Sequence, residues 1–525
     1  MRKGVFSCVA LLLVGLSLTL GERAASNQVS AQAGPEMLVS NLAVRTTISD
    51  LVTPISMAFL ANNDFFVLEK NTGQVKRVVN GAVQSTVLDL GVNFASERGL
   101  LGIALHPSFP SNPGVYLFWT CRSTGAPADP FFPDETRCLD ANMFAADTDE
   151  ILQVPLLGNR VDRFVWNGST LTFDHNLIML RAFQNDGAPV PPNQGDEEQP
   201  PRGNHDGGVL RFGPDGKLYI LFGDNGRRGQ LQNLPCGPTA NCPGPAQPDD
   251  QFGGPEPDDA HLSGVILRLN PDGTTPTDNP FFSVGAAMNG EAGANIQKIY
   301  AYGLRNSFGM DFDPISGALW EEENGDDSFS ELNRADPGFN SGWVQIMGPP
   351  ERITQYKAIE TDPGIDPCLN TPYFGLQQLR WSPTLIADSP EEALSRLFML
   401  PGAHYSEPEF SWKFELAPGA IGFMRGRGLG PQYEGDLFVG GARSFLQGGH
   451  LFHFNLTGNR RKIGVDDPRL EDRVADNLCK FDLTESETLL IGRNFGTVTD
   501  LRTGPNGNMF VVSIDTGSVF EIFRQ

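Results

Sequence analysis

Short apolar segments alternate with polar turns along the whole chain, and six stretches share one layout. Each has an apolar strand, a turn rich in Pro, Gly, Asp and Asn, and a second strand rich in Leu, Phe, Tyr and Val. The six stretches lie at 57–67, 103–118, 209–222, 310–320, 421–439 and 501–512. Asn-Gly and Asp-Gly supply the positive φ angles of tight hairpins, and the flanking residues favour strands. Each stretch is therefore predicted to be a β-hairpin.

The spacing of these hairpins indicates a radial β-array. They recur at wide but fairly regular intervals, and no long amphipathic helical pattern separates them. Units of this kind bury their faces against their neighbours in a ring. We therefore predict an all-β fold, a six-bladed β-propeller with long inserted loops, and keep a pair of β-sandwiches as the alternative. Because a ring must close, the segment 38–48 is expected to pair with the strands near 511–523, which removes two exposed edges.

The N-terminal segment is typical of an export signal. Two basic residues precede an apolar run at 5–20, and residues 31–33 form a small-x-small cleavage pattern. The apolar run is short for a membrane span, and no later segment approaches twenty apolar residues. The sequence thus predicts a signal peptide at 1–33, one propeller domain at 34–525, and a secreted or periplasmic protein without membrane insertion.

The cysteine count favours disulfides. Outside the predicted signal the chain has an even number of cysteines, as expected of an exported protein with disulfides. They are Cys121, Cys138, Cys236, Cys242, Cys368 and Cys479. The first two, and the next two, are close enough in sequence to close their own loops, which leaves Cys368 and Cys479 for each other. Sequence alone leaves the connectivity open, and no pair has the CxxC spacing of a zinc or redox site.

Composition narrows the possible partners and explains the loops. The formal charge of −24 at pH 7 argues against a nucleic-acid or anionic-membrane partner. The 59 Gly and 40 Pro supply the turns that many short strands require, and the 36 Phe can fill the spaces between twisted sheets. Three long excursions are predicted at 121–149, 225–259 and 349–409, where binding specificity tends to lie.

One histidine of the seven has a suggestive neighbourhood. Gly203, Gly207 and Gly208 flank His205 and permit close approach of a backbone or a ligand. The hairpin that follows returns Asp224 toward the same end. A carboxylate bonded to one imidazole nitrogen fixes the tautomer and raises the basicity of the other nitrogen. From these residues alone, a structural and a catalytic role are equal alternatives for His205.

Five motifs in fixed order widen this pattern. They are GLLGIALHP at 99–107, HDGG at 205–208 with FGPDGKLY after it, GVILRLNPDG at 264–273, YGLRN at 302–306, and ELN at 331–333 with GFNSGW at 338–343. From about residue 45 to the C-terminus the chain resembles the soluble glucose/sorbosone dehydrogenase family, exported aldose dehydrogenases that use pyrroloquinoline quinone (PQQ). The resemblance implies a six-bladed propeller, in agreement with the hairpin count.

The resemblance also implies roles for residues of this chain. His205 would be the general base that takes the proton from the anomeric hydroxyl of the sugar as hydride passes to the quinone, and Asp224 would orient it. Arg305 and Asn306 would bind the quinone oxygens, where a fixed guanidinium stabilises developing charge. A structural ion pair is the alternative role for Arg305.

A metal ion beside the cofactor is implied as well. The acidic segment 323–328 resembles the loop whose backbone carbonyls hold calcium, with Gly325 and Asp326 at the matching positions. Calcium takes six to eight oxygen ligands, so a turn dense in carboxylates and carbonyls suits it. A solvated acidic loop is the alternative. The implied cofactors are PQQ and Ca²⁺, and the implied partners are an aldose and an external electron acceptor.

The chain departs from the family pattern at the expected cofactor site. Arg443 stands where well-studied members have a lysine, and Glu97 stands where they have a glutamine; both are expected to contact the cofactor. Thr497 and Thr499 stand where those members have two arginines. A tricarboxylated quinone loses roughly a few kcal/mol of binding free energy when two charge-assisted partners become hydroxyls.

Two functions from different classes follow. An exported quinoprotein dehydrogenase, oxidising the anomeric carbon of an aldose to a lactone, is favoured by the joint presence of base, carboxylate and guanidinium. A non-catalytic secreted propeller that binds carbohydrate or protein is favoured by Thr497 and Thr499. A calcium-dependent lactonase has only the acidic loops in its favour. No motif indicates the sugar, the physiological acceptor or the oligomeric state.

Overall fold

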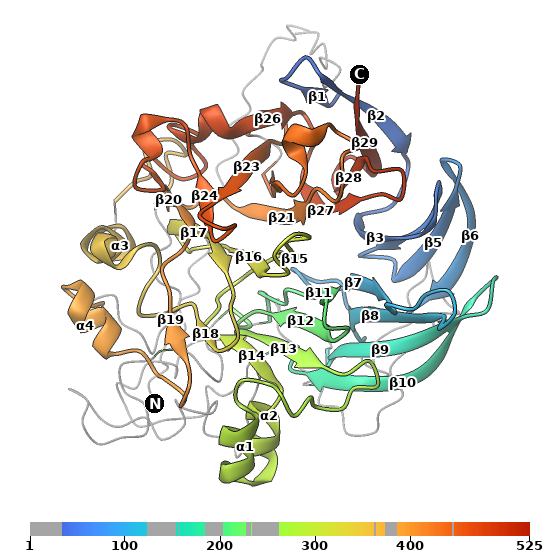
Figure 1. Cartoon of the computed structure of the whole chain (residues 1–525), viewed down its shortest axis with the longest axis horizontal. Coiled ribbons are helices and arrows are strands. Elements are labelled where there is room, and N and C mark those ends of the chain that lie inside the picture. Colours follow the sequence, from blue (N-terminus) through green and yellow to red (C-terminus); the bar gives the residue numbers. More distant parts are fainter. Residues whose placement is uncertain are drawn as a thin grey trace, which may run out of the picture. The chain divides into compact units, whose positions relative to one another are not determined.

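Six β-sheets form the blades of a propeller (Figure 1). The structure is a computed structural model, and it describes residues 34–122, 154–155, 157–183, 203–226, 233, 262–361, 364–372, 386–443 and 446–525. Each blade starts near the axis and adds strands outward; the inner strands pair antiparallel, and the short outer strands of two blades pair in parallel. The predicted all-β six-bladed fold is confirmed.

The first three blades follow one another along the chain. Blade 1 contains β3 (Pro54–Ala61), β4 (Asp64–Glu69), β5 (Gln74–Val79) and β6 (Ala82–Asp89). Blade 2 contains β7 (Leu100–Leu105), β8 (Gly114–Thr120), β9 (Asn159–Trp166) and β10 (Leu171–Leu180). Blade 3 contains β11 (Val209–Phe212), β12 (Leu218–Phe222), β13 (Val265–Leu269) and β14 (Ile299–Tyr302), extended by β18 (Phe339–Asn340) and β19 (His404–Tyr405).

The last three blades include strands brought from distant parts of the chain. Blade 4 contains β15 (Gly309–Phe312), β16 (Leu319–Glu323), β17 (Ser328–Arg334), β20 (Phe410–Phe414) and β25 (Val474–Ala475). Blade 5 contains β21 (Pro418–Phe423), β22 (Leu437–Gly441), β23 (Leu451–Thr457), β26 (Leu490–Arg493) and β1 (Glu36–Met37), with β24 (Lys462–Gly464) beside β23. Blade 6 contains β27 (Val498–Thr503), β28 (Met509–Ser513), β29 (Ser518–Arg524) and β2 (Leu42–Ile48).

Every predicted hairpin is the innermost pair of strands of one blade. The turn between β11 and β12 shows why the sequence folds this way. Gly216 has φ +73°, and its N–H donates to the carbonyl of Gly213 at 2.9 Å. The Asn-Gly turn between β27 and β28 repeats this with Gly507 at φ +80°. A glycine is needed because side-chain-bearing residues rarely adopt these angles.

The ring closes in blade 6, where the two ends of the described chain meet. β2 pairs antiparallel with β29, and the register places Leu42 opposite Arg524 and Val44 opposite Ile522. The predicted pairing with the C-terminal strands is therefore confirmed for residues 42–48, whereas Leu38 N–H donates to Ile491 O of blade 5 at 2.8 Å. This pairing removes the free edges that an open array of blades would expose.

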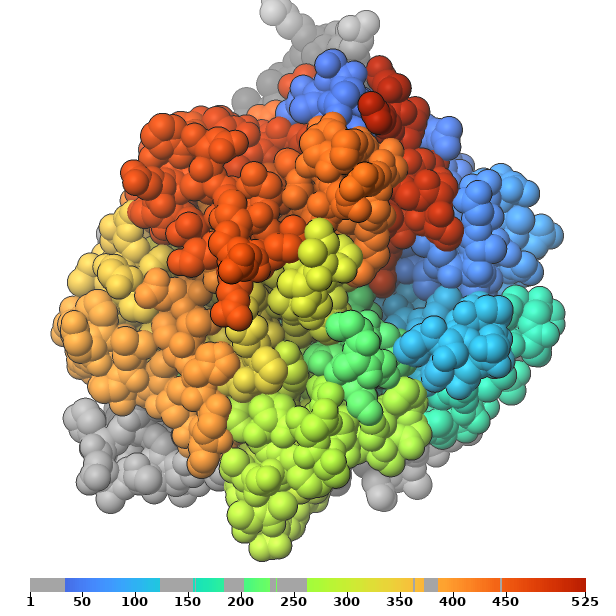
Figure 2. All heavy atoms as spheres, in the orientation of Figure 1, coloured from blue at the N-terminus to red at the C-terminus, as the bar shows by residue number. Residues whose placement is uncertain are grey.

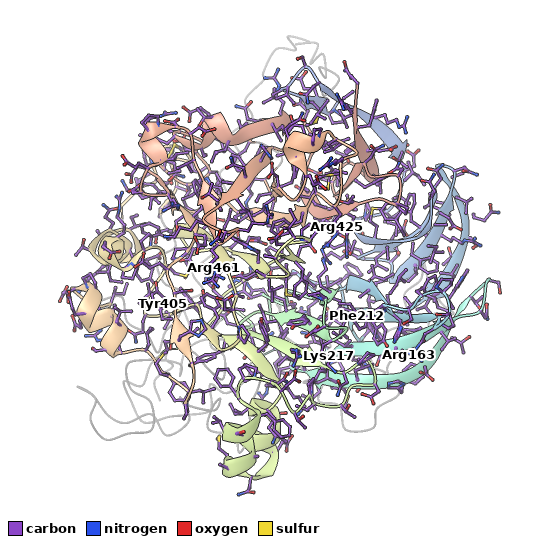
Figure 3. All side chains as sticks on the ribbon, viewed as in Figure 1. Arg163, Phe212, Lys217, Tyr405, Arg425 and Arg461 are labelled. Carbon is purple, nitrogen blue, oxygen red and sulfur yellow. A yellow bond between two sulfur atoms is a disulfide. The ribbon has the colours of Figure 1, made fainter. Side chains whose placement is uncertain are left out.

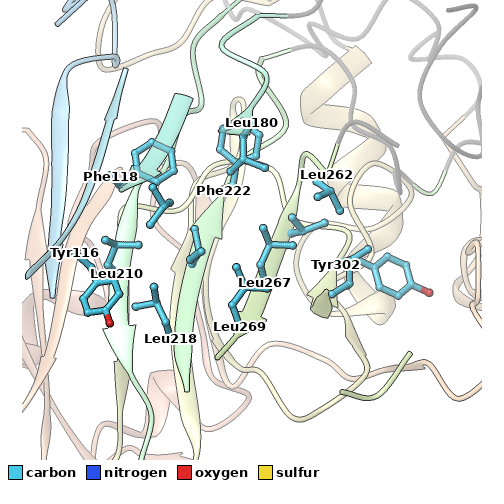
Figure 4. Packing of buried hydrophobic residues seen from close by; sticks show 14 of the residues in the cluster. Tyr116, Phe118, Leu180, Leu210, Leu218, Phe222, Leu262, Leu267, Leu269 and Tyr302 are labelled. Carbon is cyan, nitrogen blue, oxygen red and sulfur yellow. The ribbon is translucent and has the colours of Figure 1, made fainter. Parts of the chain in front are cut away.

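The core is divided among the interfaces between blades, and each neighbouring pair of blades has its own cluster of buried apolar side chains. The cluster between blades 2 and 3 is drawn in Figure 4, where Tyr116 and Phe118 of β8 face Leu210 of β11 and Leu218 and Phe222 of β12. Face-to-face packing of this kind around a ring lets each sheet bury its apolar surface without a separate central core.

Helices occur in the excursions from the blades. They are α1 (Phe282–Met288), α2 (Gly290–Ile296), α3 (Ile353–Thr361) and α4 (Pro390–Ser395), with the short 3-10 segments η1 (Pro350–Arg352), η3 (Pro431–Tyr433), η4 (Pro468–Leu470) and η5 (Ser486–Leu489). The predicted excursion 349–409 contains η1, α3 and α4, which pack on Phe329 and Trp343. The other two predicted excursions lie almost wholly outside the described residues.

One predicted disulfide is confirmed. Cys368 is bonded to Cys479, with their Cα atoms 5.9 Å apart, and ties the α3 excursion to the segment before η5. Cys121 is also disulfide-bonded, but its predicted partner Cys138, and the pair Cys236 and Cys242, lie outside the described residues. Within the described part of the chain, no helix has the length and apolar character needed to cross a bilayer.

Candidate functional site

The innermost strands share one direction along the axis and define two axial cavities. The first cavity, of about 240 Å³, is lined by residues at or just before the starts of these strands. Each blade contributes at least one of them: Ser56, Gly102, Gly207, Phe308, Gly419 and Thr499. A second cavity, of about 250 Å³, is lined by residues near the strand ends, including Phe59, Leu105, Phe212, Asp311, Arg425 and Thr503. Phe212 and Arg425 are labelled near the axis in Figure 3, and Figure 2 shows the face on which that second cavity lies. Of the predicted catalytic, cofactor-binding and metal-binding residues, Glu97 is the one among the described residues that line the first cavity.

A buried ion pair lies between the two cavities. Arg211 lines both, and its guanidinium contacts Asp500 at 3.0 Å. Asp500 also accepts from the Ser56 hydroxyl at 2.7 Å. Burial lowers the pKa of Arg211 to about 10. Burial would raise the pKa of Asp500, but Arg502 and Arg211 outweigh it and the pKa is lowered. The floor of the first cavity is therefore polar and already charge-paired.

His205 and Asp224 are joined, as predicted. His205 lies just before β11 and Asp224 just after β12, so the hairpin returns the carboxylate to the histidine. His205 Nδ1 is 2.7 Å from Asp224 Oδ1. The histidine has φ +60°, an uncommon angle for a residue with a side chain. Gly223 lets its own backbone lie close to that of His205, because a Cβ at position 223 would lie 2.3 Å from the His205 carbonyl oxygen.

Three donors converge on the buried Asp224 carboxylate. Besides His205, Gly226 N–H donates to Oδ1 at 2.7 Å and Trp343 Nε1–H donates to Oδ2 at 2.8 Å. Burial raises the pKa of Asp224, but the charges of His205 and Arg305 and these hydrogen bonds prevail, so the pKa lies below its usual value. An ionised carboxylate can only accept, so His205 Nδ1 carries a proton, and in the neutral imidazole the lone pair is on Nε2.

Glu97 links this pair to the cavity. It lines the first cavity, and its Oε2 accepts from the backbone N–H of His205 at 2.6 Å. Asn306 Nδ2 lies 3.5 Å from both oxygens of Glu97, while Asn306 Oδ1 is buried and has no hydrogen-bond partner among the residues that the structure describes. Glu97 and Asn306 were expected at the cofactor site on different motifs, and the structure brings Asn306 to Glu97 and Glu97 to the backbone of His205.

Arg305 is held in place by a network of acceptors. Its Nη1 donates to the carbonyls of Asn324 and Gly325 at 2.8 and 3.0 Å, and its Nη2 is ion-paired with Asp326. Its guanidinium carbon lies 5.3 Å from the centroid of the Trp343 ring. The ion pair that the sequence left as the alternative is therefore present. Arg305 is not among the described residues that line the first cavity.

Besides Glu97, the other three departures from the family pattern lie at or beside the cavity. Thr497 and Thr499 line it, together with Ala442. Arg443, which follows Ala442, stacks its guanidinium 4.7 Å from the centroid of the Phe481 ring and is not among the described lining residues. Arg443 was expected to bring a cation to the cofactor, but its guanidinium packs on an aromatic ring and does not line the first cavity.

Lys70 is a lining residue that sequence reasoning missed. It follows β4, so it lies at the same end as the start of β3, and its Nζ donates to the carbonyls of Phe94 and Ser96 at 3.2 and 3.1 Å. Burial lowers the pKa of Lys70 to about 8, although Asp206 and Glu97 oppose the shift. No carboxylate of the described chain lies within ion-pair distance of it. A polar residue directly after an apolar strand was the signal available in the sequence.

The oxygens expected to hold calcium are already occupied by cations. Gly325 O accepts from Arg305, the Asp326 carboxylate is paired with Arg305, and Asp326 O accepts from Lys480 Nζ at 2.7 Å. A divalent ion on these oxygens would lie beside two positive side chains. Among the described residues, the single group of three or more potential ligands within metal-binding distance is Asp366 with the disulfide-bonded Cys368 and Cys479. The arrangement of Gly325 and Asp326 therefore does not fit a calcium ion.

Comparison with known proteins identifies the family. The profile described as "Glucose / Sorbosone dehydrogenase" matches residues 51–132 and 195–369, which include the segments of His205, Asp224 and Arg305. The chain belongs to the glucose/sorbosone dehydrogenase family. This family membership agrees with the propeller fold.

Two curated relatives and one solved structure show how distant the resemblance is. The chain is 28% identical over 313 residues to quinoprotein glucose dehydrogenase B of Acinetobacter calcoaceticus (59% of this chain, 53% of the relative). It is 25% identical over 311 residues to aldose sugar dehydrogenase YliI of Escherichia coli (59% and 57%). The chain thus spans little more than half the length of these relatives. The PQQ-bound aldose sugar dehydrogenase of Streptomyces coelicolor shares the fold, with a TM-score of 0.51 at 20% identity over 93% of this chain and 99% of that chain.

Proposed function

We propose that this chain is a quinoprotein dehydrogenase that oxidises the anomeric carbon of an aldose to a lactone. The observation that carries the proposal is the 2.7 Å hydrogen bond between His205 and the buried Asp224, a pair that Glu97 connects to the axial cavity. Bound PQQ would supply the two-electron acceptor that takes hydride from the anomeric carbon. The family relationship and the names of the relatives support this reaction class.

The proton chemistry falls to His205. With Nδ1 donating to Asp224, the free lone pair of Nε2 can accept the proton of the anomeric hydroxyl. Asp224 stabilises the imidazolium that forms, because its lowered pKa keeps it ionised. Glu97 holds the His205 backbone through its N–H, and therefore helps to fix the imidazole at the cavity.

The first cavity offers a mixed set of donors for an anionic, flat cofactor. Lys70 supplies a cation, Ser56, Thr497 and Thr499 supply hydroxyls, and the floor is the paired Arg211. This set fits a carboxylated ligand, but with fewer cations than two arginines at positions 497 and 499 would provide. We infer that PQQ binds here and that its affinity rests mainly on Lys70.

The predicted export signal fits an extracytoplasmic enzyme of one propeller domain, 34–525, that passes electrons to an external acceptor. The test is direct. The purified protein is titrated with PQQ while absorbance is followed, and the loaded protein is then given a panel of aldoses with a reducible dye. Saturable binding at micromolar concentration with aldose-dependent dye reduction is expected.

One observation favours a second function, a non-catalytic carbohydrate- or protein-binding propeller. Two hydroxyls replace two guanidinium groups in the cavity, and Arg305 donates to Asn324, Gly325 and Asp326 rather than into the cavity. If the protein neither takes up PQQ at micromolar concentration nor reduces dye with any aldose of the panel, this second function replaces the first.

A further inference from the structure

The turn between β16 and β17 directs its oxygens toward two basic side chains. Gly325 allows the tight turn, because a Cβ there would lie 1.8 Å from the carbonyl oxygen of Ser328. The carbonyls of Asn324 and Gly325 accept from Arg305. The next two residues turn to Lys480 instead: its Nζ donates to Asp326 O at 2.7 Å and to Asp327 Oδ1 at 2.8 Å. Each oxygen named here therefore has a cationic donor.

Lys480 is placed there by covalent and backbone restraints. It follows Cys479, whose disulfide to Cys368 ties this segment to the α3 excursion. Its backbone N–H donates to Asp366 Oδ2 at 2.9 Å, and the next residue, Phe481, donates its N–H to Glu415 O at 2.9 Å. The lysine is 5% exposed. A buried ammonium fixed at both ends of its side chain is a built-in feature of the turn.

The geometry points to the Lys480 ammonium as the resident cation of the 324–327 turn, in the place where the family resemblance implies a metal ion, so that this chain assembles its candidate site without calcium. Calcium would approach carbonyl oxygens to about 2.4 Å. An ion at that distance from Asp326 O would lie no more than about 5 Å from Lys480 Nζ, since the ammonium is 2.7 Å from the same oxygen. Like charges at that separation in a buried site repel strongly.

The local charges are also matched without a metal. The Asp326 carboxylate is paired with Arg305, and the Asp327 carboxylate is paired with Lys480. Glu415 lies 3.7 Å from the same ammonium. Asp327 is fully buried and Asp326 is 6% exposed, so both pairs are shielded from solvent and neither is easily exchanged for a hydrated ion. This conclusion does not depend on whether the site oxidises sugars.

The experiment compares calcium binding by the wild type and by Lys480→Met. Both proteins are freed of metal with a chelator and titrated with CaCl₂ in a calorimeter, and thermal unfolding is followed with and without calcium. Met keeps an unbranched side chain, one atom shorter than that of Lys, but removes the charge, so the variant should bind calcium at least about tenfold more tightly than the wild type. Its unfolding temperature, lowered by the substitution, should rise with calcium by more than that of the wild type.

Equal calcium affinity and an equal calcium-induced shift in the two proteins would overturn the proposal. Any calcium site elsewhere contributes the same amount to both proteins and cancels in this comparison. Lys413→Met is the matched control: Lys413 reaches Asp476 only at 4.0 Å and is 30% exposed, so it should behave as the wild type. If Lys480→Met does not fold, a crystal of the wild type soaked in CaCl₂ decides, since calcium density on Gly325 O and Asp326 O refutes the proposal.

Discussion

Replacing Asp224 by Asn tests the histidine–carboxylate pair without changing its size. The carboxylate is fully buried and accepts from His205 Nδ1, Gly226 N–H and Trp343 Nε1–H at 2.7, 2.7 and 2.8 Å. An amide keeps one acceptor oxygen and turns its NH₂ group toward at least one of these donors. The variant therefore loses both the charge and part of the hydrogen bonding.

The expected size of the effect follows from these contacts. A hydrogen bond to a charged buried group contributes about 1.5–3 kcal/mol, and a donor left facing an NH₂ group adds a desolvation penalty. We expect Asp224→Asn to lower the free energy of unfolding by about 2–4 kcal/mol. Turnover should fall by about 10²- to 10⁴-fold, because the imidazole loses the acceptor that sets its tautomer.

The pH dependence of this stability loss has a definite sign. The pKa of Asp224 is lowered in the folded protein by His205 and Arg305 against the opposing effect of burial. Its stabilisation is therefore complete above the unfolded-state pKa of about 3.9 and is lost as the pH falls through the folded-state value. Urea unfolding of both proteins should show a gap that is constant from pH 7 to about pH 5 and narrows below about pH 4.

A second histidine–carboxylate pair provides the control. His453 Nε2 lies 2.8 Å from Asp436 Oδ2 on the β22–β23 side of blade 5, and neither residue is among the described lining of the axial cavities. Asp436→Asn should leave turnover unchanged. The reasoning is refuted if Asp224→Asn turns over as fast as the wild type, or if the stability gap stays constant down to pH 2.5.

Three further predictions follow from the cavity and the disulfide. Lys70→Met should weaken PQQ binding by about 10- to 100-fold in an absorbance titration, because a buried ammonium–carboxylate contact is charge-assisted, whereas binding of a trimethyl ester of PQQ should be unchanged. Because the pKa of Lys70 is lowered to about 8, the affinity of the wild type for PQQ should fall as the pH rises through that value. An affinity that does not change with pH would contradict this role of Lys70. Thr499→Arg should strengthen PQQ binding by about tenfold by adding a cation to the cavity wall, and an equal gain for the ester would speak against a charge effect. Replacing Cys368 and Cys479 together by Ser should lower the free energy of unfolding, measured in urea, by about 2–5 kcal/mol. A loss below about 1 kcal/mol would show that this disulfide does not stabilise the fold.

Much of the fold was predictable because its strongest signals are local. A Pro-Asp-Gly turn between two apolar runs, as at 214–216, specifies a hairpin within about ten residues, and all six predicted hairpins are innermost strand pairs. The outer parts of the blades could not be predicted in the same way. β18 and β19 have two residues each and pair in parallel, although they come from 339–340 and 404–405. Strands of that length carry no periodicity, and their partners are distant in sequence.

The parts of the site whose geometry is fixed by a hairpin could be predicted from the sequence. The parts whose geometry depends on a loop could not. His205 and Asp224 flank one hairpin, so their contact followed from its closure. The direction of the Arg305 side chain depends on carbonyls of the 324–327 turn, which residue types do not reveal. Lys480 reaches that turn through a disulfide between residues 111 positions apart, so no local pattern could have indicated it.

The most direct test of the central claim is the rate at which an aldose reduces PQQ bound to the protein, measured by stopped-flow absorbance in the wild type, His205→Gln and His453→Gln. Equal amounts of bound PQQ are first verified in all three proteins. If His205 is the base, the wild type and His453→Gln reduce the quinone at the same rate, and His205→Gln is slower by about 10²- to 10⁴-fold. Equal rates in His205→Gln and the wild type, with PQQ bound in both, would contradict the proposed mechanism.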